Sequence, residues 1–494
     1  MKTDFNTPQR QNFRGILVIF LMDIAKRIRQ NVYAFLPLLS SNIRENYLHF
    51  VILGFVFLLL LQLLYSYKSY LNFKFHIENQ RFFLRHGVFK FTDVDIPFDR
   101  IQNININQNL IQQMLNVVGF EIETAGQGNA EIKIKALSRD DALSLKAILL
   151  DAKVENLEDV VPTENKDVKN EVLFKLDLGR LLKVGISSNY LKGLGLVVAF
   201  FATLYQYIED VFSNFFDINF DEEYVSQVPE TVGFFGVVAI FIITAAFLVT
   251  VGSSIIKYFE LKITKVNNEF EVEYGLFKRI NQVVKKNKTQ VFEIEQNPLK
   301  DLFKIKNVYI SQASSEEVTD KKKIGLVGLS DEEVSTLFHS LFDLSYPQEF
   351  INSYSSMRLI IRLMSLFMII SIGVGIGLYF LQGLIMAIVI FSLLLSLFSL
   401  IAYKTVKKSH IGINENIIEV HSGSIHTNKK YIATHKIQSL ALKQNWFQQR
   451  NQHADLIIYT ASGSERISYL KYENVLKIVN CLNFKVESSR LSWI

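Results

Sequence analysis

The chain lacks the residues and motifs of most common catalytic sites. It has a single cysteine, Cys481, in 494 residues, so it can form no disulfide within itself. It also lacks the phosphate-binding GxxxxGK(S/T) loop, the HExxH, GxSxG and CxxC motifs, and a dinucleotide-binding glycine fingerprint after a strand. We therefore expect a protein that is not an enzyme, with no catalytic residues, no cofactor-binding residues and no cofactor.

Charge is absent from five long apolar runs. They are 48–67, 194–208, 232–256, 363–381 and 384–403, and none contains Asp, Glu, Lys or Arg. Four of the runs are long enough to cross about 30 Å of hydrocarbon as helices. The run at 194–208 becomes long enough with flanking residues from about Tyr190. These runs predict five membrane spans.

The first forty residues leave two possibilities open. Residues 13–28 place their apolar side chains on one helical face, which is typical of a helix lying in the membrane interface. Residues 32–41 contain a proline and could form a short crossing. A sixth span therefore remains undecided.

One soluble segment occurs three times without a gap. The copies align on Gly87, Gly275 and Gly423, at offsets of 188 and 148 residues. Each marker glycine is followed by a glutamine fifteen residues later and by an asparagine twenty-two residues later. These residues are Gln102, Gln290 and Gln438, and Asn109, Asn297 and Asn445. The preceding apolar run ends 19 or 20 residues before each marker glycine, so hairpin and soluble segment form one duplicated unit.

The hydrophobic periodicity within a copy predicts mostly β-structure. In the first copy, short alternating runs between 73 and 137 indicate seven or so strands, with the marker glycine in a turn that needs positive φ. The period then becomes helical, with capping boxes at Ser138 and Asp141 and, in the second copy, at Ser330 and Glu333. This helix is predicted to close the curved sheet. Its predicted buried residues are Ala142, Leu145, Ile148 and Leu149.

The predicted domain boundaries follow these patterns. The N-terminal interfacial helix and membrane hairpin occupy 1–72, the first repeat 73–152, and a linker with a juxtamembrane helix 153–189. The second hairpin occupies 190–257 and the second repeat 258–344. A juxtamembrane segment with the third hairpin occupies 345–403, the third repeat 404–484 and a tail 485–494.

Charge is distributed unevenly between the two ends of the apolar runs. Residues 209–230 hold seven acidic residues and no Lys or Arg, whereas the opposite ends carry basic residues such as Lys68, Lys257 and Lys404. Because positively charged loops stay in the cytoplasm, this predicts a multi-pass protein of the cell membrane. All three repeats then face the cytoplasm, with short hairpin loops outside.

Short motifs in the first copy indicate a family. It contains GVF at 87–89, IP at 96–97, RIQ at 100–102 and TAG at 124–126. This pattern resembles the bacterial pleckstrin-homology-like (PH-like) domains of the second type in YdbS/YdbT-like membrane proteins, and the three-unit layout resembles the YdbT kind. The resemblance implies membrane α-helical hairpins combined with three α+β PH-like domains. Each would be a curved sheet or barrel of short antiparallel strands, closed by a C-terminal helix. It implies no established activity or ligand.

Basic residues cluster near the marker-glycine hairpin of every copy. Near an anionic membrane surface each would contribute roughly 1 kcal/mol, and the alternative is a solvated strand face. The candidate membrane-surface or ligand contacts are Arg81, Arg85, Lys90, Arg100, Lys278, Arg279, Lys285, Lys286, Lys288, Lys429, Lys430 and Lys436.

Other polar groups favour structural roles. The Gln-Asn pairs that end at Asn109, Asn297 and Asn445 are expected to stabilise a turn through side-chain hydrogen bonds to the backbone. His421, His426 and His435 lie in one repeat, but they show no ligand spacing and no fourth ligand, so no metal site is expected.

The leading hypothesis is a non-enzymatic integral membrane protein whose three cytoplasmic PH-like domains act as a scaffold, a sensor or a lipid- or protein-binding module. The alternative is a transporter or channel for a hydrophobic or lipid-like solute. Gln62 and Gln206 are the only amide side chains in the runs, which argues against an ion path. An enzyme acting on lipid ranks third.

The expected partners are the lipid bilayer and anionic lipid headgroups. The resemblance adds a smaller YdbS-like membrane protein. The net charge of +5 is weak evidence for nucleic acid, and no nucleic-acid partner is expected.

Overall fold

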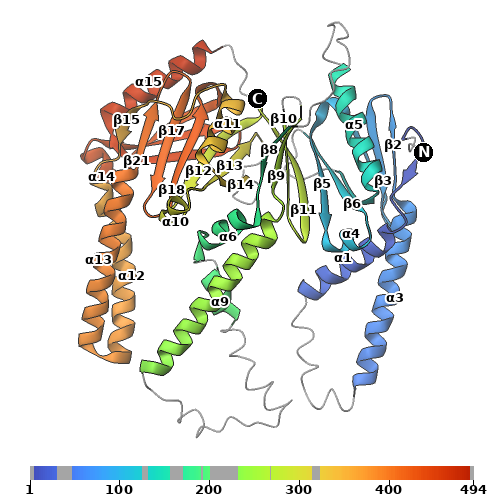
Figure 1. Cartoon of the computed structure of the whole chain (residues 1–494), viewed down its shortest axis with the longest axis horizontal. Coiled ribbons are helices and arrows are strands. Elements are labelled where there is room, and N and C mark those ends of the chain that lie inside the picture. Colours follow the sequence, from blue (N-terminus) through green and yellow to red (C-terminus); the bar gives the residue numbers. More distant parts are fainter. Residues whose placement is uncertain are drawn as a thin grey trace. The chain divides into compact units, whose positions relative to one another are not determined.

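The computed structural model of the chain describes residues 5–30, 47–124, 132–155, 171–190, 193–200, 232–266, 269–313 and 323–489. These residues form two compact units (Figure 1). Unit 1 contains the first repeat and residues 271–283 of the second. Unit 2 contains most of the second repeat and all of the third.

Four helices in the described part of the chain are long and apolar enough to span a membrane. They are α3 (Leu48–Asn72), α9 (Val232–Tyr258), α12 (Leu359–Gln382) and α13 (Leu384–Lys408). Figure 1 shows α12 and α13 as an antiparallel pair, which turns at Gly383. The four helices confirm four of the five predicted spans. The fifth, at 194–208, lies mostly outside the described residues, as does the acidic loop at 209–230.

The N-terminal helix α1 (Gly15–Gln30) has two apolar faces. Val18 is fully buried against Val117 and Ala136 of the first repeat, whereas Leu17 and Leu21 are exposed. The exposed face suits a helix at the membrane surface, which stays a prediction. Residues 32–41 lie outside the described part.

Each repeat contains six strands, a short helix and a long C-terminal helix. The first repeat consists of β2 (Lys74–Glu78), β3 (Arg81–His86), β4 (Thr92–Pro97), β5 (Ile101–Asn109), α4 (Leu110–Met114), β6 (Val118–Thr124), β7 (Ile132–Leu137) and α5 (Arg139–Glu155). The second consists of β9 (Lys262–Val266), β10 (Glu269–Tyr274), β11 (Lys278–Lys285), β12 (Thr289–Gln296), α10 (Pro298–Leu302), β13 (Lys306–Gln312), β14 (Ile324–Leu329) and α11 (Asp331–Phe342). The third consists of β16 (His410–Ile413), β17 (Ile417–Gly423), β18 (Thr427–Ala433), β19 (Ile437–Lys443), α14 (Trp446–Arg450), β20 (His453–Thr460), β21 (Gly463–Lys471) and α15 (Tyr472–Ser488).

A seventh strand joins each repeat from the segment that precedes its membrane helices. These strands are β1 (Gln9–Arg10), β8 (Glu171–Lys175) and β15 (Ile351–Tyr354), and each lies beside the first strand of its repeat. The predicted number of strands is therefore right, but this strand was not predicted. The juxtamembrane helix predicted within 153–189 is present as α6 (Leu178–Ile186).

The long helix of each repeat covers the core. In the first repeat, Ala142, Leu145 and Leu149 of α5 are fully buried in a cluster that includes Phe82 and Phe120. The burial prediction is wrong for Ile148, which is 41% exposed because it lies at the edge of the buried face. The serine caps are confirmed at both predicted positions, where Asp141 N and Glu333 N donate to the preceding serine hydroxyls. The predicted glutamine–asparagine turns are confirmed as well: Asn109, Asn297 and Asn445 cap the short helices.

The marker glycines form the turn between the second and third strands of each repeat. Their φ angles are +136° at Gly87, +110° at Gly275 and +107° at Gly423, which confirms the predicted backbone. A Cβ at Gly423 would lie 2.0 Å from the carbonyl oxygen of His426, and equivalent clashes occur at the other two glycines. No other residue type fits these turns without moving the hairpin.

The repeats are joined strand to strand. In unit 1, β5 of the first repeat pairs antiparallel with β11 of the second, and Gln108 lies opposite Arg279. In unit 2, β12 pairs with β18, and the equivalent residues Gln296 and Thr427 lie opposite each other. Both junctions therefore have the same register.

Side chains cross the second junction in both directions. Val291 of β12 belongs to the core of the third repeat. Tyr431 of β18 packs edge-on against Phe338 of α11, with ring centroids 5.3 Å apart, and so contributes to the second repeat. Such pairing makes neighbouring repeats share their cores.

Two strands whose counterparts form the junctions have a free edge in the described structure: the third strand β4, which pairs only with β3, and the fourth strand β19, which pairs only with β20. The exposure of their side chains agrees with this. Gln438 and Ser439 of β19 are exposed, whereas the equivalent Gln290 and Val291 of β12 are 0% and 4% exposed. The sheets of the third repeat therefore end at an open edge.

The substitution Gly423→Ala should lower the stability of the full-length protein by at least about 1 kcal/mol, because alanine must adopt positive φ and its Cβ meets a carbonyl oxygen. The midpoint of thermal unfolding in detergent measures this. Gly373→Ala in α12 is the matched control, since a Cβ there meets nothing within 4 Å. Equal midpoints for the two variants would contradict the role of the marker glycine.

Candidate functional site

The marker-glycine hairpin of each repeat is held against the end of the membrane helix that precedes it. A hydrogen bond links the two elements in every copy. The bonds run from Asn72 Nδ2 to Gly87 O (3.0 Å), from Leu276 N to Ile256 O (3.0 Å) and from Lys408 Nζ to Ser424 O (2.8 Å). The turn of each hairpin is therefore fixed at the level where its span ends.

An exposed apolar side chain lies at the same position of each hairpin turn. These residues are Phe89, Phe277 and Ile425, which are 91%, 48% and 48% exposed. A lysine follows in two copies, as Lys90 and Lys278, and His426 follows in the third. An apolar residue beside a cation suits the headgroup region, where apolar and charged groups are both accommodated.

The short helix of each repeat extends the same edge. In unit 1, the Gln113 side chain of α4 donates to the carbonyl of Leu276 in the second hairpin (3.0 Å), so helix and hairpin turn are adjacent. The short helices also expose apolar side chains: Leu110 and Met114 in α4, Leu299 and Leu302 in α10, and Trp446 and Phe447 in α14. We call these hairpin turns and short helices the membrane-facing edge of each repeat.

The basic residues singled out from the sequence fall into two groups. The residues of the first group, Lys90, Arg100, Lys278 and Arg279, are exposed. All of them except Arg100 lie next to a hairpin turn. Arg279 also belongs to the second group, whose members pair with acidic residues: Arg81 with Asp95, Arg85 with Asp93, Arg279 with Glu260, Lys285 with Glu269, Lys286 with Asp343, and Lys430 with Glu465. Contact of these residues with lipid stays a prediction.

Three of the predicted basic residues line a cavity of about 930 Å³ in unit 2 instead of a hairpin turn. They are Lys285, Lys286 and Lys436, at the opposite end of the hairpin strands from the turns. Lys436 is almost fully buried and donates to the carbonyl of Asn287 (2.6 Å). Burial lowers the pKa of Lys436. Lys288 lies in the β11–β12 turn, and Lys429 lies opposite His421.

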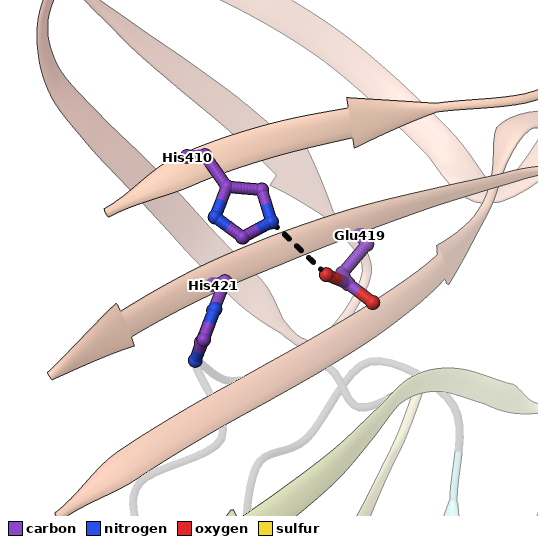
Figure 2. Close-up of side chains that lie close together, drawn as sticks. All are labelled: His410, Glu419 and His421. Atoms are coloured by element: carbon purple, nitrogen blue, oxygen red, sulfur yellow. Dashed lines mark hydrogen bonds and ion pairs between the residues drawn. The ribbon is translucent and has the colours of Figure 1, made fainter. Parts of the chain in front are cut away.

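A polar cluster on the third repeat was not anticipated from the sequence. His410 of β16 and Glu419 and His421 of β17 lie together on one face of the two strands (Figure 2). His410 Nε2 is 3.2 Å from Glu419 Oε1, and the two imidazole rings lie 5.0 Å apart and nearly perpendicular. The signal in the sequence is the spacing of Glu419 and His421, two residues apart on one strand, with His410 in register opposite His421.

Burial governs the charge of this cluster. It lowers the pKa of His421 to about 4, with His410 and Lys429 adding to the effect, so this imidazole is neutral at pH 7. Burial would raise the pKa of Glu419, but its polar contacts with His410 and Tyr431, together with the charge of Lys429, lower it overall. Glu419 is therefore a carboxylate beside a neutral imidazole.

Comparison with known proteins agrees with this architecture. A sequence profile described as "Bacterial PH domain" matches residues 28–153, 214–344 and 364–484, which together make up more than half of the chain. The chain belongs to the bacterial PH domain family. Each match includes membrane-helix residues together with a PH domain, so helix and domain form one unit of the family.

One curated relative is named as a transmembrane protein. The chain is 23% identical over 317 residues to "UPF0699 transmembrane protein YdbT" of Bacillus subtilis (strain 168). The aligned region covers 62% of this chain and 63% of the relative, so the chain spans less than two thirds of that protein's length. Three bacterial PH domains and apolar helices establish a YdbS/YdbT-like membrane protein. They identify no enzyme family.

The membrane-facing edge can be tested with a fluorophore on one cysteine. Cys481→Ser removes the single native thiol, and Ile425→Cys or Ser464→Cys supplies a labelling site. Ser464 lies near the first end of β21 (Gly463–Lys471). Tyr469 lies near the other end of this strand, where it packs against Leu359 of α12 and Val406 of α13. In nanodiscs, lipid-attached quenchers should quench the label at 425 several-fold more than the label at 464. Equal quenching would contradict this orientation.

Proposed function

We propose that this protein is a non-enzymatic scaffold of the membrane. Its three PH domains lie in the cytoplasm at the inner face and bind a second PH-domain membrane protein through the open edge of β19. The observation that carries the proposal is the repeated junction. Twice within this chain, the strand equivalent to β19 pairs with the third strand of another PH domain, in one register.

The exposed face of β19 fits such a partner. Ser439 is equivalent to Val291, which is buried in the core of the next domain. Ala441 is equivalent to Glu293, which lies opposite Lys430 across the junction. Small side chains at these two positions leave room for the side chains of an added strand. Strand addition of this kind supplies affinity through main-chain hydrogen bonds and specificity through alternate side chains.

A second copy of the same chain fits this edge less well. In the shared register, β4 of another copy would place Asp95 opposite Leu440. Asp95 forms a bidentate pair with Arg81 on the exposed face of β4, accepting from Nε at Oδ1 and from Nη2 at Oδ2. The equivalent residues at the two internal junctions are Val283 and Tyr431, which are buried. Charged side chains and a proline on an edge strand are a common protection against pairing, and β4 also ends at Pro97.

The partner that fits best is a smaller YdbS-like membrane protein with an apolar residue at the position of Tyr431. Both proteins would be held in one membrane with their PH domains at the same depth, which raises their effective concentration. The membrane-facing edge supports this placement. Lys90 and Lys278 would each contribute roughly 1 kcal/mol at an anionic inner surface.

The substitution Ser439→Asp should weaken association with a YdbS-like partner at least about tenfold, because a carboxylate would enter the partner's core without a counter-charge. Förster transfer between labelled proteins reconstituted in the same liposomes measures the association. Ser439 is exposed, so the variant should keep the unfolding midpoint of the parent protein.

The matched control is Ser464→Asp, the same change at an exposed position outside β19. Its association should equal that of the parent protein. Equal association of all three proteins would exclude β19 as the binding edge. Self-association of this chain that is lost in Ser439→Asp would show that a second copy occupies the edge instead.

A further inference from the structure

We propose that His410, Glu419 and His421 bind a Zn²⁺ ion in the third PH domain. The three residues each offer one donor atom, and these atoms lie within 4.8 Å of one another (Figure 2). Two imidazole nitrogens and a carboxylate oxygen form a donor set that Zn²⁺ accepts, with water in the fourth position of a tetrahedron. His410 and Glu419 are buried and His421 is half-buried, so few competing waters reach the site.

The backbone orients His410 as a ligand. Its Nδ1 lies 2.9 Å from the carbonyl oxygen of Lys408, which accepts a hydrogen bond and cannot donate one. Nδ1 therefore carries the proton, and in a neutral ring the lone pair of Nε2 points at Glu419. A ring nitrogen that donates to a backbone carbonyl while the other binds a metal is the usual arrangement of histidine ligands.

Two lone pairs facing each other at 3.2 Å repel unless a cation lies between them or beside them. A second proton on His410 would satisfy the pair it forms with Glu419. It would leave His421 unexplained, because its Nε2 is buried and has no hydrogen-bond partner among the described residues. Such buried polar atoms are rare and costly. One metal ion accounts for all three side chains.

The residues packed around the cluster neither block nor complete the site. The ring of Tyr354 lies 5.0 Å from that of His410, and Tyr431 donates to Glu419. Lys429 is a cation on the same face, in register opposite His421, and Lys408 also acts on His421. The charge of Lys429 opposes a bound dication, so its removal should strengthen metal binding.

The site belongs to the third domain alone. The equivalent positions are Lys74, Phe83 and Arg85 in the first domain and Lys262, Glu271 and Glu273 in the second. A lysine replaces His410 in both, and Glu271 pairs with Lys146 at 2.7 Å. The metal would therefore distinguish the domain that carries the open edge. The ion would link β16 to β17, the first two strands that follow α13 in the chain.

The test uses the full-length protein without a histidine tag, in nanodiscs and stripped with a chelator. Titration with Co²⁺ should show one saturable equivalent with the intense visible absorption of a tetrahedral site, and Zn²⁺ should displace it. His421→Gln and Glu419→Gln should each weaken Zn²⁺ binding at least about 100-fold, because each removes a direct ligand. Lys429→Gln should bind Zn²⁺ several-fold more tightly.

His426→Gln is the matched control, since His426 lies at the exposed hairpin turn. Its affinity for Zn²⁺ should equal that of the parent protein. The proposal is overturned if the parent protein binds no stoichiometric Co²⁺ or Zn²⁺, or if His426→Gln and His421→Gln lose affinity equally. Lys429→Gln keeps all three ligands, so unchanged or weaker binding in a folded Lys429→Gln variant also counts against it.

Discussion

The antiparallel pairing between neighbouring PH domains is the constraint on which the rest of the soluble structure depends. Because Gln108 faces Arg279 and Gln296 faces Thr427, the two junctions repeat one register. A shift of one residue would turn every side chain at a junction to the wrong face. The shared cores make such a shift costly, since Tyr431 and Val291 each pack in the neighbouring domain. At β19, the equivalent strand of the third domain has no partner strand in the described structure.

The position of each domain relative to its membrane helix follows from a second local constraint. A glycine with positive φ lets the chain reverse directly beside the end of the span. The hairpin turn is then tied to that helix by a hydrogen bond, so its apolar tip has little freedom to move away from the end of the helix. In the third domain, Asp455 strengthens this connection. It is buried and contacts Arg362 of α12, at 3.7 Å, as well as Arg466.

Features governed by neighbours in the sequence were predictable. The apolar runs, the marker glycines, the serine caps and the asparagine turns each depend on residues a few positions apart, and the structure confirms them within the described residues. Features that depend on distant segments of the chain were not predictable. Strand β15 precedes two membrane helices and still pairs with β16. Ile148 has helical spacing close to that of its buried neighbours but lies at the edge of the face.

The candidate sites also combine features that the sequence predicts with features that only the fold decides. The basic character of the hairpins is a matter of composition, yet the fold separates Lys90 and Lys278 at the turns from Lys285 and Lys436 at the far end of the strands. The threefold unit, its membrane anchorage and its family were determined by the sequence, because periodicity and motif spacing are local properties. Tertiary structure alone decided which edge is open and which histidines meet. The reason is that hydrogen-bonded strand pairing, between distant strands at the junctions and between β16 and β17 at the histidines, selects which side chains become neighbours.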